Sequence, residues 1–303
     1  MKKIFSFLIA LTFFFSPIGV EFLQPSQQSS GVSQIQVSLK IAYALLKTNL
    51  QGYWKLDESS GTRVDAHTNG NDLSDINTVP AATGIINNGA DFTLANSEYL
   101  SITDANQIGL DFSGDFTLSM WVKGASYGIN SLLGKWDESA NNQRAYRPVY
   151  FDATGIMSFY YSSDGIESLT KDWTSITLNI DTWYHLVFVN DVSGSNDINF
   201  YINGVSQTAV ATAVSPFNAS SAFVIGADIN GVTPQNFFDG IIDEVAVWSR
   251  AITSAEVTEI YNSGNALAFA DWDAVPATGF EWGTIIQTPY KPFLSLLNNL
   301  KYI

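Results

Sequence analysis

The sequence predicts an all-β fold, a sandwich or jelly roll. From Gln51 onward, short runs of β-branched and aromatic residues alternate with clusters of Gly, Asn, Asp and Ser, which is the pattern of strands separated by turns. Helical periodicity is almost absent from this region, and regularly spaced strands without helices are typical of sandwiches and jelly rolls. The 303 residues suffice for one large β domain with appendages, or for at most two ordinary domains.

Four segments carry the clearest strand signals. They are residues 116–122, 156–160, 183–189 and 197–202. The last one is followed directly by Asn203 and Gly204. Because this pair accepts the positive φ angles of a type I′ turn, we expect a hairpin there.

One helix is predicted near the end of the β region, in TSAEVTEIYNSG (residues 253–264). Thr253 can cap its first turn while Glu256 reaches back to the cap, which together form a capping box. Its apolar stripe consists of Val257, Ile260 and Tyr261. Gly264 is expected to end the helix.

The N-terminal segment, residues 1–20, has the pattern of a signal peptide. Two lysines precede an apolar stretch over residues 4–15, which is too short to span a bilayer comfortably and is typical of an exported protein. We therefore expect no transmembrane span. The alternative is a retained apolar segment that packs on the protein or in a larger assembly.

The remaining boundaries follow from changes in composition. Residues 21–50 are predicted to be a leader or linker, in which 21–31 is rich in Pro, Gln and Ser, while 35–46 fits a strand or a helix equally well. The β domain is expected to span residues 51–264. The tail, residues 265–303, contains apolar stretches that would pack on the domain or meet a partner, since such segments rarely stay exposed.

Composition excludes several classes of function. The formal net charge of −15 argues against a nucleic-acid partner, because phosphate contacts need clustered Lys and Arg. The absence of cysteine excludes disulfides, thiolate metal sites and cysteine nucleophiles. With only two histidines, His67 and His185, a multi-histidine zinc site is impossible.

An ordered set of short motifs resembles a known family. The motifs are WKLDESSG at 54–61, Asp65 with NGN at 69–71, NGADF at 88–92, FT and WV at 116–117 and 121–122, WYH at 183–185, FYING at 200–204, and FDGIIDEVAVWSRAIT at 238–253. In this order they resemble the laminin-G-like, concanavalin A-like jelly rolls, in particular the bacterial and viral LamG domain proteins. The resemblance covers about two thirds of the chain and implies a jelly-roll β-sandwich with one short C-terminal helix.

The two acids inside the last motif raise the question of a metal. Strand alternation places Asp243 on the face of the neighbouring valines, pointing into the sandwich, and Glu244 on the outward face. The resemblance implies a structural Ca²⁺ that joins an acid of the first strand, Asp57, to Asp243, with backbone oxygens of the turn around Asn88 and with Asp65 as a weaker candidate. The alternative is that Asp243 accepts backbone N–H bonds and binds no metal.

The acids do not form a glycosidase pair in the sequence. Some glucanases share this fold and present acids on one strand face as E-x-D-x-E, a motif that this chain lacks. Asp243 and Glu244 are adjacent, so on a regular strand they face opposite ways. His185 lies in a strand without a nucleophile-elbow pattern and is expected to be a core histidine. We therefore expect no enzymatic activity.

A binding function remains, and aromatic side chains are its candidates. Jelly rolls bind sugars through loop aromatics and polar groups, and Trp136, Tyr146, Arg144 and Trp173 are available for this. Each ring could equally belong to the core. The sequence thus favours an exported recognition or adhesion module, at the cell surface or secreted, that binds glycan or a surface protein. Two alternatives stay open: a structural or assembly protein of a virion or cell surface, whose termini make subunit contacts, and a carbohydrate-active enzyme.

Overall fold

The computed structural model describes residues 18–22, 37–41 and 46–272, except residues 129, 140, 151–155, 175, 177 and 208–211. The chain forms two compact units, one over Leu45–Asp273 and one made of Met1–Ala44 with Ala274–Ile303. In the second unit, β1 (Ile18–Phe22) pairs antiparallel with β2 (Val37–Ile41), so residues 37–41 of the ambiguous stretch 35–46 form a strand. Most of the predicted signal segment and linker, and the tail beyond Trp272, lie outside the described residues.

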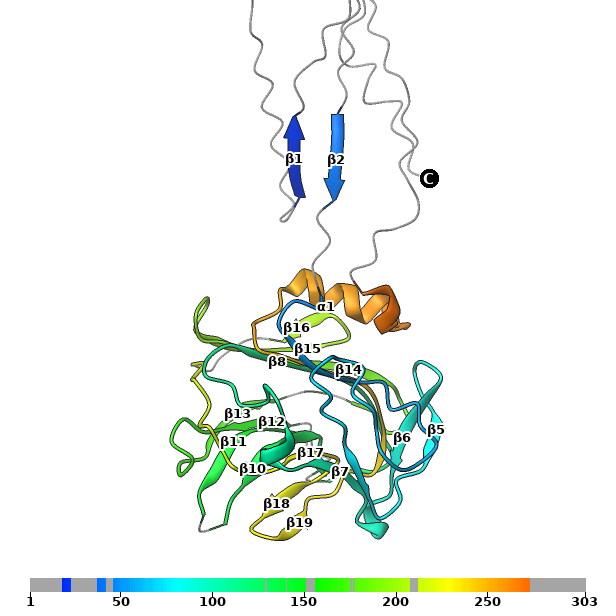
Figure 1. Ribbon diagram of the computed structural model, residues 1–303, viewed down its shortest axis with the longest axis vertical. Helices are drawn as coiled ribbons and strands as arrows, with labels where there is room; N and C mark the ends of the chain where they lie inside the picture. Colours follow the sequence, from blue (N-terminus) through cyan, green and yellow to red (C-terminus); the bar gives the residue numbers. More distant parts are fainter. Residues whose placement is uncertain are drawn as a thin grey trace, which may run out of the picture. The chain divides into compact units, whose positions relative to one another are not determined.

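The unit Leu45–Asp273 is a sandwich of two sheets, which confirms the all-β prediction (Figure 1). Sheet I has eight strands in the order β16 (Val205–Gln207), β15 (Asp197–Ile202), β14 (Tyr184–Asp191), β8 (Phe116–Gly124), β20 (Gly240–Trp248), β6 (Asn88–Phe92) and β5 (Ala81–Thr83), with β3 (Leu50–Trp54) also paired to β20. All of these pairings are antiparallel.

Sheet II has ten strands. Its main path is β13 (Leu169–Trp173), β12 (Met157–Tyr161), β11 (Gln143–Tyr150), β10 (Leu133–Asp137), β17 (Phe223–Ile225), β7 (Tyr99–Ile102) and β4 (Ser74–Ile76). Off this path, β9 (Asn130–Ser131) pairs with β11, and the hairpin of β18 (Asp228–Asn230) and β19 (Thr233–Gln235) meets β10. The sheet is antiparallel except where β10 and β18 pair through Asp137 and Ile229.

The main core fills the space between the two sheets. Strand β8 shows how the sequence produces it: alternate residues Leu118, Met120 and Val122 are fully buried in this core, as a period of two requires. Stacked aromatic rings continue it, with the centroids of Phe188 and Phe200 only 4.5 Å apart. The core thus ties sheet I to sheet II through apolar contacts.

The local predictions are confirmed where the chain is described. The four predicted strands correspond to β8, β12, β14 and β15. Asn203 and Gly204 have φ angles of 52° and 78°, so the turn between β15 and β16 has positive φ at both central positions, as a type I′ hairpin demands. Helix α1 (Ser254–Tyr261) begins with the predicted capping box of Thr253 and Glu256.

A second apolar cluster covers the outer face of sheet I. Helix α1 and the following segment, with the 3-10 turns η3 (Asn262–Gly264) and η4 (Phe269–Asp271), lie on this face (Figure 1). Trp272 stacks on Trp248 of β20 at 5.5 Å between ring centroids. The helix ends earlier than predicted, because Asn262 takes the left-handed C-cap position instead of Gly264. The unit that contains both sheets and this cluster runs over Leu45–Asp273.

Among the helices in the described part of the chain, none is long and apolar enough to cross a membrane.

Candidate functional site

Asp243 is a fully buried carboxylate held by backbone N–H groups. Its Oδ2 accepts hydrogen bonds from the backbone of Ile85 at 2.8 Å and Ile86 at 3.2 Å, and its Oδ1 accepts one from Glu244 at 2.9 Å. Burial raises the pKa of Asp243 to about 7, in spite of these three bonds, and the negative charge of Asp57 adds to the rise. Its ionised form is therefore costly here, and a nearby cation would offset that cost.

The turn between β5 and β6 joins two of the other predicted metal ligands, Asp57 and Asn88, and lies beside Asp243. Asn88 donates its backbone N–H to Asp57 Oδ1 at 3.2 Å and its side-chain amide to the Asp57 carbonyl at 3.0 Å. The turn packs closely at Gly84, because a Cβ there would lie 2.4 Å from Asp243 Oδ2 and 2.5 Å from the carbonyl oxygen of Asn88. Asp243 and the Asn88 carbonyl thus lie on one side of this turn, and Asp57 is hydrogen-bonded to Asn88.

This oxygen-only set of donors fits a hard cation such as Ca²⁺. Asp57 and Asp243 would supply carboxylate oxygens and Asn88 its carbonyl, while water would complete the shell. No group of three or more His, Asp or Glu that could hold a metal exists in the part of the chain that the structure describes. Calcium therefore remains a prediction, and the hydrogen bonds of Asp243 are those of the metal-free alternative.

Asp65 accepts hydrogen bonds from backbone N–H groups of β3 and of the loop that follows it. Its Oδ1 accepts hydrogen bonds from the backbone of Tyr53 and His67, both at 2.8 Å, and its Oδ2 accepts one from Asn71 at 2.9 Å. Burial raises its pKa, and the bonds from Asn71 and His67 oppose the rise. These contacts tie β3 to the loop that follows it.

Glu244 lies on the outer face of sheet I, as alternation predicts, but that face is not open to solvent. A β-bulge shifts the pairing of β20 with β8 between Asp243 and Ala246, and Glu244 adopts a left-handed φ of 50° within it. The carboxyl lies beneath α1 and its following segment, with only 7% of the residue exposed. Burial raises the pKa of Glu244 to about 8.

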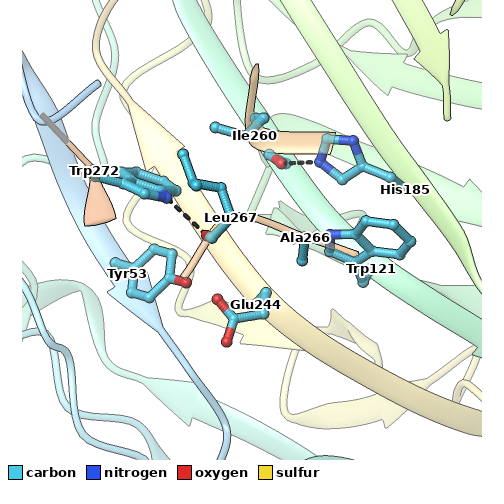
Figure 2. Close-up of a pocket in the computed structure, with 9 residues that line it drawn as sticks. Tyr53, Trp121, His185, Glu244, Ile260, Ala266, Leu267 and Trp272 are labelled. Atoms are coloured by element: carbon cyan, nitrogen blue, oxygen red, sulfur yellow. Dashed lines mark hydrogen bonds between the residues drawn. The ribbon is translucent and has the colours of Figure 1, made fainter. Parts of the chain in front are cut away.

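Glu244 shares a small enclosed pocket with His185 and Ser119 (Figure 2). Ser119 Oγ lies 2.9 Å from His185 Nε2, and burial lowers the pKa of His185 to about 3. The pocket measures about 10 Å³, which is room for about one water molecule. A substrate cannot enter, so the Ser–His contact is part of the interior.

Three of the residues predicted to bind ligand are buried. Tyr146 and Trp173 belong to the main core, where Tyr146 Oη donates to the carbonyl of Leu110 at 2.9 Å. Trp136 is 2% exposed, and its ring packs against the guanidinium of Arg147 at 5.2 Å. The structure gives each ring a packing role.

Arg144 organises the loops at one rim of sheet II. Its guanidinium donates to the carbonyls of Glu138 at 2.9 Å and Ile166 at 2.8 Å and to Asn142 Oδ1 at 3.2 Å. These contacts join the loop after β10 to the loop after β12. They also shape an open groove beside this rim.

The groove measures about 520 Å³, within the range of roughly 300–1,000 Å³ typical of small-ligand sites. Its polar lining consists of Asp137, Asn141, Gln143, Ser220, Ser221 and Gly231. Sequence reasoning did not find these residues, because they come from three separate loops that only the fold brings together. The polar stretch between Trp136 and Arg144 was the one available signal.

The fold is a jelly-roll β-sandwich with an open, polar rim. A profile of the concanavalin A-like lectin/glucanase superfamily, of the laminin G type, matches residues 94–258, which is more than half of the chain, so the chain belongs to this family. No curated protein matches the chain.

Several solved structures share the fold at low sequence identity. The binding domain of Paraclostridial mosquitocidal protein 1 is 19% identical, with a TM-score of 0.56, over 72% of this chain and 53% of that one. Domain 4 of AbnA, an extracellular arabinanase from Geobacillus stearothermophilus, in complex with arabinotriose, is 20% identical, with a TM-score of 0.52, over 70% and 97%. A structure of botulinum neurotoxin type C, whose cell entry depends on interaction with two ganglioside molecules, is 12% identical, with a TM-score of 0.55, over 72% and 52%. The chain spans about half the length of the two toxin structures.

Proposed function

We propose that this protein is an exported, non-enzymatic recognition module that binds glycan at a surface and is stabilised by calcium. The observation that carries the proposal is the open polar groove on a rigid jelly-roll rim, in a chain of the concanavalin A-like lectin/glucanase superfamily. Similar folds that bind arabinotriose or depend on gangliosides support the choice of glycan over a surface protein. The apolar N-terminal segment behind two lysines supports export.

The state of the acids supports the absence of catalysis. Glycoside hydrolysis needs two carboxyl groups, about 5–10 Å apart, that both reach the scissile bond. Asp243 is fully buried and bonded to the backbone, and Glu244 faces a pocket that holds about one water. Neither can reach a sugar.

Binding and hydrolysis are separated in one experiment. The full chain is tested against an immobilised panel of neutral and acidic glycans, and the same glycans are incubated with it and assayed for new reducing ends. The proposal predicts retention on part of the panel without new reducing ends. A blank panel contradicts glycan recognition, and released sugar contradicts the non-enzymatic role.

The calcium part has its own test. We expect EDTA to lower the melting temperature and Ca²⁺ to restore it, because a ligand that binds only the folded state at about 100 times its dissociation constant adds about 2.7 kcal/mol. Asp243→Ala and the milder Asp57→Asn should abolish this difference. Asp172→Asn, at the edge strand β13, is a control that should keep it. An identical melting curve with EDTA and with Ca²⁺ would refute calcium binding.

A further inference from the structure

The rim groove is built from the ends of several strands and their loops. Asp137 ends β10, Gln143 begins β11, Ser221 precedes β17, and Gly231 lies in the hairpin of β18 and β19. Gln143 Oε1 accepts hydrogen bonds from the backbone and hydroxyl of Ser220 at 2.7 and 3.0 Å. The walls are therefore fixed to one another before any ligand arrives.

Asp137 is the anchored acceptor of the groove. Its Oδ1 accepts the backbone N–H groups of Ser139 at 2.8 Å and Gly231 at 2.7 Å, which joins the loop after β10 to the β18–β19 hairpin. Burial alone would raise its pKa, but the bonds from Gly231 and Ser139 hold the pKa below its ordinary value. The carboxylate is thus charged at neutral pH and has a fixed position.

Ser221 is the polar group that the protein leaves without a partner. The residue is 7% exposed, and its hydroxyl is buried without a hydrogen bond. Such a group is less stable than a satisfied one. Ser221 forms part of the groove wall, so a rotation about its χ1 would let the hydroxyl meet a ligand in the groove.

The charge of the lining selects the class of ligand. The described residues that line the groove include one carboxylate, amides and hydroxyls, but no Lys, Arg or His. Arg144 nearby is engaged with loop carbonyls. The positive charge of Arg144 also helps to lower the pKa of Asp137. Within the described lining the Asp137 carboxylate is the one charged group, so it favours ligands that donate hydrogen bonds from hydroxyl groups over anions.

We propose that this groove binds a neutral saccharide, with Asp137 accepting hydrogen bonds from its hydroxyl groups and Ser221 completing the contact. This assignment rests on the proposed recognition function and specifies its site and its ligand class. An acidic sugar would meet the carboxylate of Asp137 and no basic side chain in the described lining, so the site favours neutral sugars.

The test measures sugar binding by full-length variants. Isothermal titration uses neutral oligosaccharides, arabinotriose among them, and sialyllactose as the acidic counterpart. Ser221→Ala should weaken neutral-sugar binding about 3- to 10-fold, the value of one hydrogen bond, without lowering the melting temperature, because the hydroxyl has no partner in the protein. Asp137→Asn should weaken it further. Ser206→Ala, at an exposed serine of β16, is the matched control and should bind as the wild type does.

The possible results distinguish a wrong groove assignment from a wrong recognition function. Neutral-sugar binding that Ser221→Ala and Asp137→Asn leave unchanged places the site elsewhere and overturns this assignment, while the recognition function stands. Preferential binding of sialyllactose overturns the ligand class. A protein that binds no sugar at all contradicts the proposed function, and the groove assignment falls with it.

Discussion

Gly84 offers the sharpest test of the turn that holds Asp57 and Asp243 together. In Gly84→Ala the new Cβ would lie 2.4 Å from Asp243 Oδ2 and 2.5 Å from the carbonyl oxygen of Asn88. Both contacts are closer than real Cβ atoms come to other atoms, and one of them is with backbone, so rotation of a side chain cannot relieve it. The turn has to open, and overpacking of this kind costs about 1–3 kcal/mol.

The free-energy cost of Gly84→Ala can be converted into a shift of the melting temperature. For a domain of this size, 1 kcal/mol shifts the melting temperature by about 2–4 °C, so a cost of about 2 kcal/mol predicts a fall of about 4–8 °C. The measurement is thermal unfolding followed by circular dichroism, first in EDTA and then with Ca²⁺. In Ca²⁺ the deficit should grow if the proposed ion binds, because the displaced Asp243 and Asn88 oxygens would hold it less well.

Gly114→Ala is the matched control. A Cβ at Gly114 would meet no atom within 4 Å, and both variants restrict the unfolded chain to the same degree. Its melting temperature should therefore stay within about 1–2 °C of the wild type, since a surface substitution changes stability by about 0.5 kcal/mol at most. Equal shifts in the two variants would refute the steric argument about Gly84.

Three further predictions concern the covered face of sheet I. His185 is buried with a pKa of about 3, below its ordinary value of 6.5, so the unfolded state takes up the proton first and stability falls as pH drops below 6.5. We expect His185 to lower the free energy of unfolding by about 2 kcal/mol between pH 7 and pH 5. Urea titrations should show that the stability of His185→Gln depends less on pH than that of the wild type. Parallel stability–pH profiles of the two proteins would contradict the burial of a neutral His185. Thr253→Ala removes both the cap of α1 and half of its capping box, which should cost about 1 kcal/mol in urea denaturation; an unchanged midpoint would show that α1 does not depend on its cap. Trp272→Ala removes a ring that stacks on Trp248 and meets Tyr53 edge-on at 4.9 Å. It should cost about 3 kcal/mol, and a loss below about 1 kcal/mol would mean that the segment after α1 contributes little to the cluster.

Local rules were sufficient for much of the fold. Each predicted strand needed only its own residues and the turn chemistry beside it, and Asn203 with Gly204 specified their hairpin because few other pairs accept positive φ twice in succession. The capping box of α1 is equally local. These features depend on neighbours in sequence, which one sequence displays directly.

The bulge at Glu244 lies beyond such rules. Strict alternation gives the correct face for this residue, but it contains no information on what covers that face. The segment that buries Glu244 comes from the predicted tail, where Trp272 joins the cluster of Trp248 and Tyr53. Burial by a distant segment is a tertiary effect. It makes a side chain that the sequence predicts to be solvent-exposed part of the interior.

The candidate site likewise has a part that the sequence predicted and a part that only the fold shows. The resemblance of motifs grouped Asp57, Asn88 and Asp243. The structure places Asp243 and Asn88 beside Gly84, and Asp57 is hydrogen-bonded to Asn88. The motifs in the sequence could not reveal the groove, because Asp137, Ser221 and Gly231 are almost a hundred residues apart from first to last. The aromatic residues that drew attention instead, Tyr146 and Trp173, were needed for the core.

The position of Trp248 has a mechanical consequence. Its indole Nε1 donates to the carbonyl of Leu46 at 2.6 Å, while its ring stacks on Trp272, so the first and last described residues of the domain meet at one side chain. A pull on the two ends of the described domain would therefore act on these contacts and on the adjoining pair of Leu50 with Trp248. Figure 1 shows the β18–β19 hairpin, which contributes to the groove, on the far side of the sandwich from α1. The rim that carries the groove is therefore turned away from the two ends of the described domain, which meet at Trp248.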